Sequence, residues 1–167
     1  SNVKYVSMDM NSTYRDFAYH HFKGCIVMAD SFHVIKNIND ALRNLRIRIM
    51  NKYERTSKEY YLLKHWNYLL MKRNGDIEDN IPKYNKKIGY AINKLGILEM
   101  ILEIDPVLKK AYRWKEDYLD FNEDCPFENA SERFDELYTQ LVKMNINEFK
   151  DVVSLLKNWK IEIINSF

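Results

Sequence analysis

The sequence predicts a predominantly α-helical protein that begins with a small α/β piece. Only three prolines and four glycines interrupt the 167 residues, which favours long helices and argues against an all-β fold. Two short apolar runs, Val3–Met8 and Cys25–Ala29, flank a single predicted helix, and apolar residues then recur every three or four positions. The order strand, helix, strand predicts two parallel strands joined by a right-handed crossover.

The first elements are recognised by their composition and by their ends. Val3–Met8 carries the β-branched and aromatic residues typical of a strand. Asn11-Ser12-Thr13 offers an N-cap for a helix over Tyr14–Phe22, which Lys23-Gly24 ends. Cys25–Ala29 is apolar throughout, as expected for a strand that is buried on both faces.

The remainder of the chain predicts helices only. Asp30 or Ser31 caps a long helix that runs to Met50, with its apolar residues spaced by three and four. A loop is expected over Glu123–Phe127. The other predicted helices cover Ser57–Arg73, Pro82–Glu103, Pro106 to about Asp120 with Asp105 as cap, Glu128–Lys143, and a last one to about Asn165 that starts with a capping box of Asn145 and Glu148.

A sheet of only two strands has two open edges and is not stable alone. We therefore expect either that this chain pairs with another chain or that it is a piece of a longer protein.

The composition is that of a soluble globular protein. No run of about 18 apolar residues is present, and the start lacks the basic and apolar regions of a signal peptide. Cys25 and Cys125 have no metal-type spacing, and we expect both to be reduced. These features predict a cytoplasmic, bacterial protein without a membrane span.

Charge is distributed unevenly, although the net charge is only +2. Eight basic residues and three acidic ones lie between Lys36 and Lys64, whereas nine acidic residues and one arginine lie between Glu116 and Glu136. Both stretches are compatible with solvated helix faces, and the first also with binding of nucleic acid. The candidate nucleic-acid contacts are Lys36, Arg43, Arg46, Arg48 and Lys52.

Two aspartates follow the two predicted strands directly. Parallel strands place Asp9 and Asp30 at the same sheet edge, where ligands of such sheets bind. Close carboxylates favour a cation between them, and Mg²⁺ prefers oxygen ligands. The alternative is that each aspartate caps the following helix, which fits Asp30 best. His33 is either an auxiliary hydrogen-bond donor near phosphate or a packed structural residue.

Three ordered stretches resemble one known family: "VSMDMNSTY…F…CIVMADSFHVIKNINDALRNLR", "LKKAYRWKEDYLDF" and "LLKNWKIEIINSF". The set is similar to the DDE transposases of bacterial insertion sequences, of the ISL-three type, over essentially the whole chain. That family carries "vs-D-M-…-Y", then "i-v-x-D-x-F-H-v-x-K" and a run ending in arginines. The motif "DxFH" is weak by itself, but the ordered set is strong. Ser31 departs from the arginine that is common there.

The resemblance implies a ribonuclease H-like catalytic domain whose three acids bind two Mg²⁺ or Mn²⁺ ions. Val3–Met8 would be its fourth strand, Cys25–Ala29 its fifth, and Asp9 its second catalytic acid and metal ligand. The other two acids would lie outside this chain. The implied domains are a partial catalytic core over 1–55, a helical insertion over 56–144, and a returning helix over 145–167.

The implied function is DNA strand cleavage and transfer in transposition, with DNA as partner and a homo-oligomer as a possibility. Because one or two acids cannot hold a metal pair, we expect this piece alone to bind no metal and to be inactive. Two alternatives stay open. One is a non-catalytic helical module for DNA or protein interaction, and the other is a small phosphohydrolase that uses Asp9 and Asp30.

Overall fold

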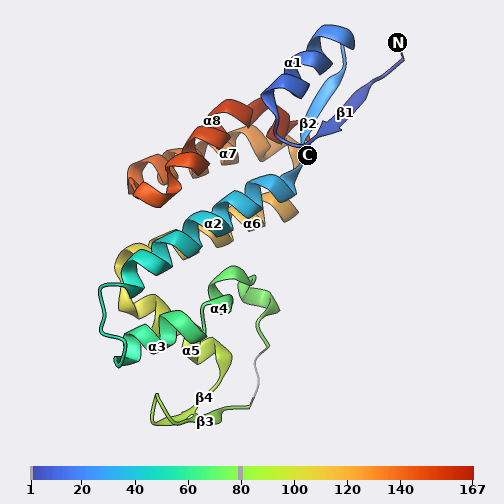
Figure 1. Ribbon diagram of the computed structural model, residues 1–167. Coiled ribbons are helices and arrows are strands. Elements are labelled where there is room, and N and C mark those ends of the chain that lie inside the picture. Colours follow the sequence, from blue (N-terminus) through green and yellow to red (C-terminus); the bar gives the residue numbers. More distant parts are fainter. Residues whose placement is uncertain (1, 79–80) are drawn as a thin grey trace. The chain divides into compact units, whose positions relative to one another are not determined.

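The computed structural model describes residues 2–78 and 81–167, and it is predominantly helical (Figure 1). It begins with β1 (Tyr5–Met8), α1 (Ser12–His21) and β2 (Ile26–Ala29), in the predicted order. The two strands are parallel neighbours, and Met8 pairs with Ala29. The Asn11 side chain caps α1 by accepting from the amides of Thr13 and Tyr14. The expected mainly helical chain with two parallel N-terminal strands is thus confirmed.

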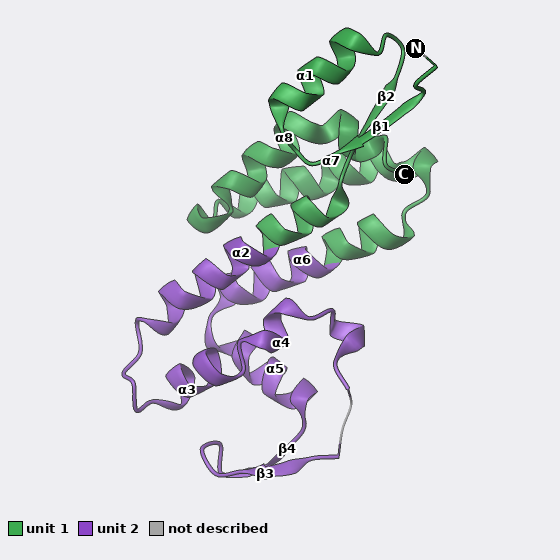
Figure 2. Ribbon diagram, turned by 45° about the vertical axis from the view of Figure 1, so that its right-hand side comes forward, with its two compact units in different colours: residues 1–38, 117–167 green, residues 39–116 purple. Residues whose placement is uncertain are grey.

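The described chain divides into two compact units, coloured separately in Figure 2. Unit 1 consists of residues 1–38 and 117–167, and unit 2 of residues 39–116. The helices α2 (Ser31–Met50) and α6 (Pro106–Asp124) each contribute one part to either unit. These bounds differ from the partition implied by the resemblance, which stays a prediction.

Unit 1 packs the small sheet against helices from both ends of the chain. Ala18, Cys25 and Val27 form a buried apolar cluster beneath the strands. The helices α7 (Phe127–Met144) and α8 (Lys150–Ile164) complete the unit, and α8 contacts β2. The side-chain amide of Asn165 donates to the Val27 carbonyl at 2.9 Å. This bond occupies the outer edge of β2, whereas no further strand pairs with β1 among the described residues.

A buried carboxylate joins α1 to α8 within unit 1. Glu162 is buried, and its Oε1 accepts from the Tyr19 hydroxyl at 3.0 Å and lies 3.7 Å from Arg15 Nη1. The Arg15 guanidinium lies 4.3 Å from the ring centroid of Trp159. Burial, followed by the bond to Glu162, raises the pKa of Tyr19 to about 12. Glu162 is therefore committed to holding α1 and α8 together.

Unit 2 contains an element that the sequence analysis did not predict. The expected helix over Pro82–Glu103 is wrong: β3 (Lys83–Asn85) and β4 (Tyr90–Ile92) form an antiparallel hairpin, and only then does α5 (Lys94–Ile104) begin. The Asn85 side chain accepts from the amides of Lys87 and Ile88, and Gly89 has a φ of 95°. Asn favours such side-chain-to-backbone turns, and Gly tolerates this φ.

Two other helix boundaries also differ from expectation. The predicted helix over Ser57–Arg73 is two helices, α3 (Lys58–His65) and α4 (Tyr68–Met71), followed by the 3-10 turn η1 (Asn74–Asp76). At the break the Asn67 side chain donates to the Lys64 carbonyl at 2.6 Å, so side-chain bonding ends the first helix.

The capping box predicted at Asn145 is also wrong. Asn145 adopts a left-handed conformation, with a φ of 50°, and ends α7 as its C-cap. A 3-10 turn, η2 (Asn147–Phe149), then precedes α8. The two cysteines are free, as predicted.

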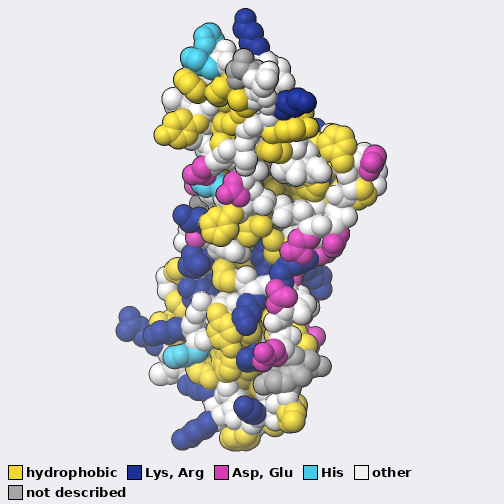
Figure 3. Space-filling view, turned by 90° about the vertical axis from the view of Figure 1, so that its right-hand side faces the viewer, with side chains coloured by type: hydrophobic (Ala, Val, Ile, Leu, Met, Phe, Trp, Pro, Cys, Tyr) yellow, Lys and Arg dark blue, Asp and Glu magenta, His cyan; other side chains and the backbone are white. Residues whose placement is uncertain are grey.

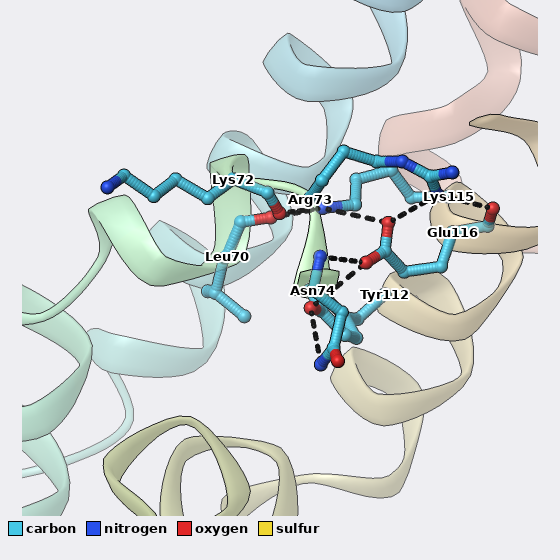
Figure 4. A network of polar contacts seen from close by, with 7 residues as sticks. All are labelled: Leu70, Lys72, Arg73, Asn74, Tyr112, Lys115 and Glu116. Carbon is cyan, nitrogen blue, oxygen red and sulfur yellow. Dashed lines mark hydrogen bonds and ion pairs between the residues drawn. The ribbon is translucent and has the colours of Figure 1, made fainter. Parts of the chain in front are cut away.

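A polar network lies inside unit 2 (Figure 4). Lys115 is only 1% exposed, and its ammonium donates to the carbonyls of Leu70 at 2.9 Å and Lys72 at 2.7 Å. Glu116 pairs with Lys115 at 3.7 Å and with Arg73 at 3.3 Å, and it accepts from the Asn74 amide. Burial lowers the pKa of Lys115 to about 8, with Glu116 acting in the opposite direction. The network fixes α4 and η1 on α6.

Candidate active site

Asp9 lies directly after β1, at the carboxyl end of the parallel sheet. Its carbonyl accepts from the Asn11 amide at 2.7 Å, which turns the chain toward α1. Its Oδ1 accepts from the Met10 amide at 2.8 Å and lies 3.0 Å from Nδ1 of His33. The Asp9 side chain is 74% exposed, and its Oδ2 receives no hydrogen bond from the described residues. One carboxylate oxygen is thus fixed, and the other is open to solvent.

His33 occupies the first turn of α2, and its side chain is 34% exposed. Its amide donates to the Asp30 carbonyl at 3.2 Å, and its own carbonyl accepts from the Asn37 side chain at 2.8 Å. Since the carboxylate of Asp9 accepts only, Nδ1 of His33 carries the proton of this contact. His33 can therefore orient Asp9, and its Nε2 is the second ring nitrogen available to solvent or ligand.

Asp30 is the neighbour of Asp9 at the same sheet edge, because the two residues follow the paired Met8 and Ala29. Its amide donates to the Met8 carbonyl at 3.0 Å, and its Oδ1 accepts from the Phe32 amide at 3.0 Å. Asp30 thus caps α2, as one of the two interpretations expected. Asp9 is the carboxylate that is not consumed by a helix cap.

The residues at this edge supply few ligands for a metal. Within the described ranges, no group of three or more His, Cys, Asp and Glu side chains could hold a metal ion. The exposed Oδ2 of Asp9 suits one coordination position of a hard cation, which prefers carboxylate oxygen. A pair of ions does not fit on Asp9 and Asp30 alone, because Asp30 already serves as a cap.

Comparison with known proteins decides what kind of site this is. A family model described as Transposase, of the DDE ISL-three type, matches residues 1–167, which is the whole chain. The chain belongs to this transposase family. Searches of curated proteins and of solved structures found no match. The family membership makes the parent enzyme one that acts on DNA, and the resemblance in the sequence is confirmed.

The basic residues predicted to contact nucleic acid do not share one surface of the transposase chain. Lys36, Arg43, Arg48 and Lys52 are exposed, but Lys36 belongs to unit 1 and the other three to unit 2. Arg43 pairs with Asp40 at 2.7 Å. These four remain candidate contacts.

Arg46 must be removed from that set. It is only 8% exposed, and its Nη1 donates to the Leu63 carbonyl at 2.9 Å inside unit 2. Its neighbours at three and four positions, Leu42 and Ile49, are buried as well. Arg46 therefore lies on the apolar side of α2 and ties α2 to α3, instead of facing a ligand.

The transposase carries a second basic region that sequence reasoning missed. The hairpin brings Lys86 and Lys87 close to Arg55 and Lys64, with several tyrosines between them. Its sequence signal is "KYNKKIGY", in which asparagine and glycine are separated by three residues. Trp114, considered as a base-stacking residue, is buried in unit 2 and belongs to the core. No described helix is long and apolar enough to cross a membrane.

Proposed function

We propose that this chain supplies Asp9 as one metal-binding carboxylate of a transposase that cleaves and transfers DNA strands with Mg²⁺ or Mn²⁺. The observation that carries the proposal is the position of Asp9. It is an exposed carboxylate at the carboxyl end of a parallel strand, hydrogen-bonded to His33. Divalent ions, when bound, activate water and stabilise the leaving oxygen in phosphodiester chemistry.

The contacts of Asp9 suit a metal ligand better than a structural role. The Met10 amide and His33 both bind Oδ1, so Oδ2 is left to point into solvent in a fixed orientation. Carboxylate ligands of metals are typically oriented by such hydrogen bonds from neighbouring groups. We assign His33 as the positioning residue of Asp9, and we assign Asp30 mainly to the cap of α2.

The same geometry supports the proposal that the isolated chain is inactive. One open carboxylate cannot hold a metal pair, and further acids would have to come from protein outside residues 1–167. The edge of β1 is a place where more of a sheet could be added, since no described strand pairs there. A catalytic domain of the ribonuclease H-like type would provide such strands.

We expect no specific nicking when the 167-residue chain is incubated with labelled transposon-end DNA and Mg²⁺ or Mn²⁺. The full-length transposase that contains this chain serves as the positive control on the same DNA. Nicking is followed by denaturing electrophoresis of the labelled strand. Specific nicking by the isolated chain that disappears in Asp9→Asn would refute the need for further acids, and it would favour the small phosphohydrolase instead.

DNA is the proposed partner because the chain belongs to a transposase family. The exposed Lys36, Arg43, Arg48 and Lys52 are proposed as phosphate contacts, each acting as a sequence-independent positive charge. The alternative of a protein-interaction module rests on the acidic face of α7, where Glu128, Glu132, Asp135 and Glu136 line one shallow cleft. Phosphates would be repelled from that face, so the two surfaces suit partners of opposite charge.

A further inference from the structure

Two neighbouring clefts of unit 2 are lined by basic and aromatic side chains and by no acidic ones. We call them together the hairpin surface. They measure about 470 Å³ and about 450 Å³, within the range of about 300–1,000 Å³ usual for ligand clefts. Tyr61 and Lys87 line both of them, so the surface is continuous. Its residues are Tyr61, Tyr84, Asn85, Lys86 and Lys87 in the first cleft, and Arg55, Tyr60, Tyr61, Lys64, His65 and Lys87 in the second.

The cations of the hairpin surface are not neutralised by the protein. Within residues 2–78 and 81–167, no carboxylate forms an ion pair with Arg55, Lys64, Lys86 or Lys87. Other cations of the chain do have such partners: Arg43 pairs with Asp40, and Lys109 pairs with Glu103. Lys and Arg side chains gather over unit 2 on the face drawn in Figure 3. Four unpaired charges on one concave surface attract a polyanion.

The hairpin surface is built on fixed hydrogen bonds. The hydroxyl of Tyr61 accepts from the side chain of Asn85 at 3.1 Å and from the indole of Trp66 at 3.3 Å. Because both contacts use oxygen lone pairs, the hydroxyl proton of Tyr61 stays available, and no described residue accepts it. The ammonium of Lys87 donates to the Thr56 carbonyl at 3.0 Å, which holds the turn on the loop before α3. A phosphate oxygen is a suitable acceptor for Tyr61.

Aromatic rings on the same surface are open to solvent. Tyr84 is 71% exposed and lies next to Lys86 and Lys87 in the first cleft. Exposed aromatic rings between lysines are the arrangement with which proteins bind single-stranded nucleic acid, because every unpaired base offers a face for stacking. In a duplex these base faces are covered by neighbouring base pairs, so the tyrosine favours unpaired nucleotides.

We propose that the hairpin surface binds a single-stranded segment of DNA. Arg55, Lys64 and Lys86 contact successive phosphates, Tyr61 donates its hydroxyl proton to a phosphate oxygen, and Tyr84 stacks on a base. The choice of DNA rests on the proposed function, because the transposase family supplies the nature of the polymer. The binding itself does not involve Asp9 or any metal, and it can be measured separately from cleavage.

The test measures fluorescence anisotropy of a labelled oligothymidine of about 20 nucleotides with the 167-residue chain at several salt concentrations. The double variant Lys64→Glu/Lys86→Glu is expected to weaken binding at least about tenfold. It should also flatten the salt dependence, by about 0.7 in the logarithmic slope per lost phosphate contact. Tyr84→Ser is expected to weaken single-strand binding by about 5- to 100-fold, the range for loss of one stacked base.

A matched control is Lys150→Glu/Lys157→Glu, which makes the same change of charge on exposed positions of α8 in unit 1. It should retain binding within about threefold, and circular dichroism checks that all variants are folded. Equal binding by the hairpin variants and the wild type, or an equal loss in the control, overturns the surface. Equal affinity for duplex, together with no effect of Tyr84→Ser, overturns the single-strand assignment. Asp9→Asn should bind normally, so failure of the catalytic assignment leaves this result unchanged.

Discussion

Asp9→Asn in the full-length transposase is expected to lower the rate of strand cleavage by at least about 10³-fold. The substitution keeps the size of the side chain and a hydrogen-bond acceptor for the Met10 amide, but it removes the negative charge that faces the cation. Loss of metal-based stabilisation of several kcal/mol corresponds to a rate effect of this order. The measurement is the initial rate of nicking of labelled transposon-end DNA in Mg²⁺, with DNA binding determined in parallel.

Asp30→Asn is the matched control for this substitution. Asparagine caps helices about as well as aspartate, so the amide of Phe32 keeps its acceptor and α2 stays in place. We expect a loss of less than about tenfold in the cleavage rate. Near-normal cleavage by Asp9→Asn, or a larger loss in Asp30→Asn than in Asp9→Asn, would show that the wrong carboxylate has been assigned.

Lys115→Ala is expected to destabilise unit 2 by about 3 kcal/mol. The substitution leaves the carbonyls of Leu70 and Lys72 without their donor and opens a cavity in the core. It also removes one of the two cations that contact Glu116, and breaking a buried ion pair is costly. Chemical denaturation followed by tryptophan fluorescence and circular dichroism measures the loss. A change below about 1 kcal/mol would mean that the network does not stabilise unit 2.

Lys115→Met serves as the control that fills the same space without a charge. The folded pKa of Lys115 is lowered to about 8 from 10.5, so between these pH values the unfolded chain binds more protons than the folded one. The free energy of unfolding of the wild type should therefore rise with pH across this window, relative to Lys115→Met. A difference between the two proteins that stays constant or shrinks as the pH rises would contradict the buried charge.

Local signals in the sequence identify most elements of unit 1. The apolar runs before Asp9 and Asp30 and the cap at Asn11 each depend on residues that are adjacent in the chain. The hairpin was missed because apolar residues between Pro82 and Glu103 also fit a helical period, which outweighed the turn formed by Asn85 and Gly89. The position of a turn was present in the sequence, but the pairing of β3 with β4 is a tertiary choice.

The candidate site was predicted in its parts and not in its contacts. The sequence places Asp9 and Asp30 at one sheet edge, but only the structure distinguishes the capping carboxylate from the one that binds His33. Arg46 was misassigned because basic residues were counted by composition, although its spacing to Leu42 and Ile49 already placed it on the buried side of α2. The hairpin surface required long-range proximity between α3 and the turn, which no local pattern contains.

Iron-directed cleavage of the protein backbone tests the assignment of Asp9 most directly. Fe²⁺ replaces Mg²⁺ in the full-length transposase, and ascorbate with peroxide generates hydroxyl radicals that cut the chain beside the bound ion. The account predicts cuts next to Asp9 and at the start of α2, competed by Mg²⁺ and absent in Asp9→Asn. An active transposase whose chain is cut only at places remote from residue 9 would contradict the account.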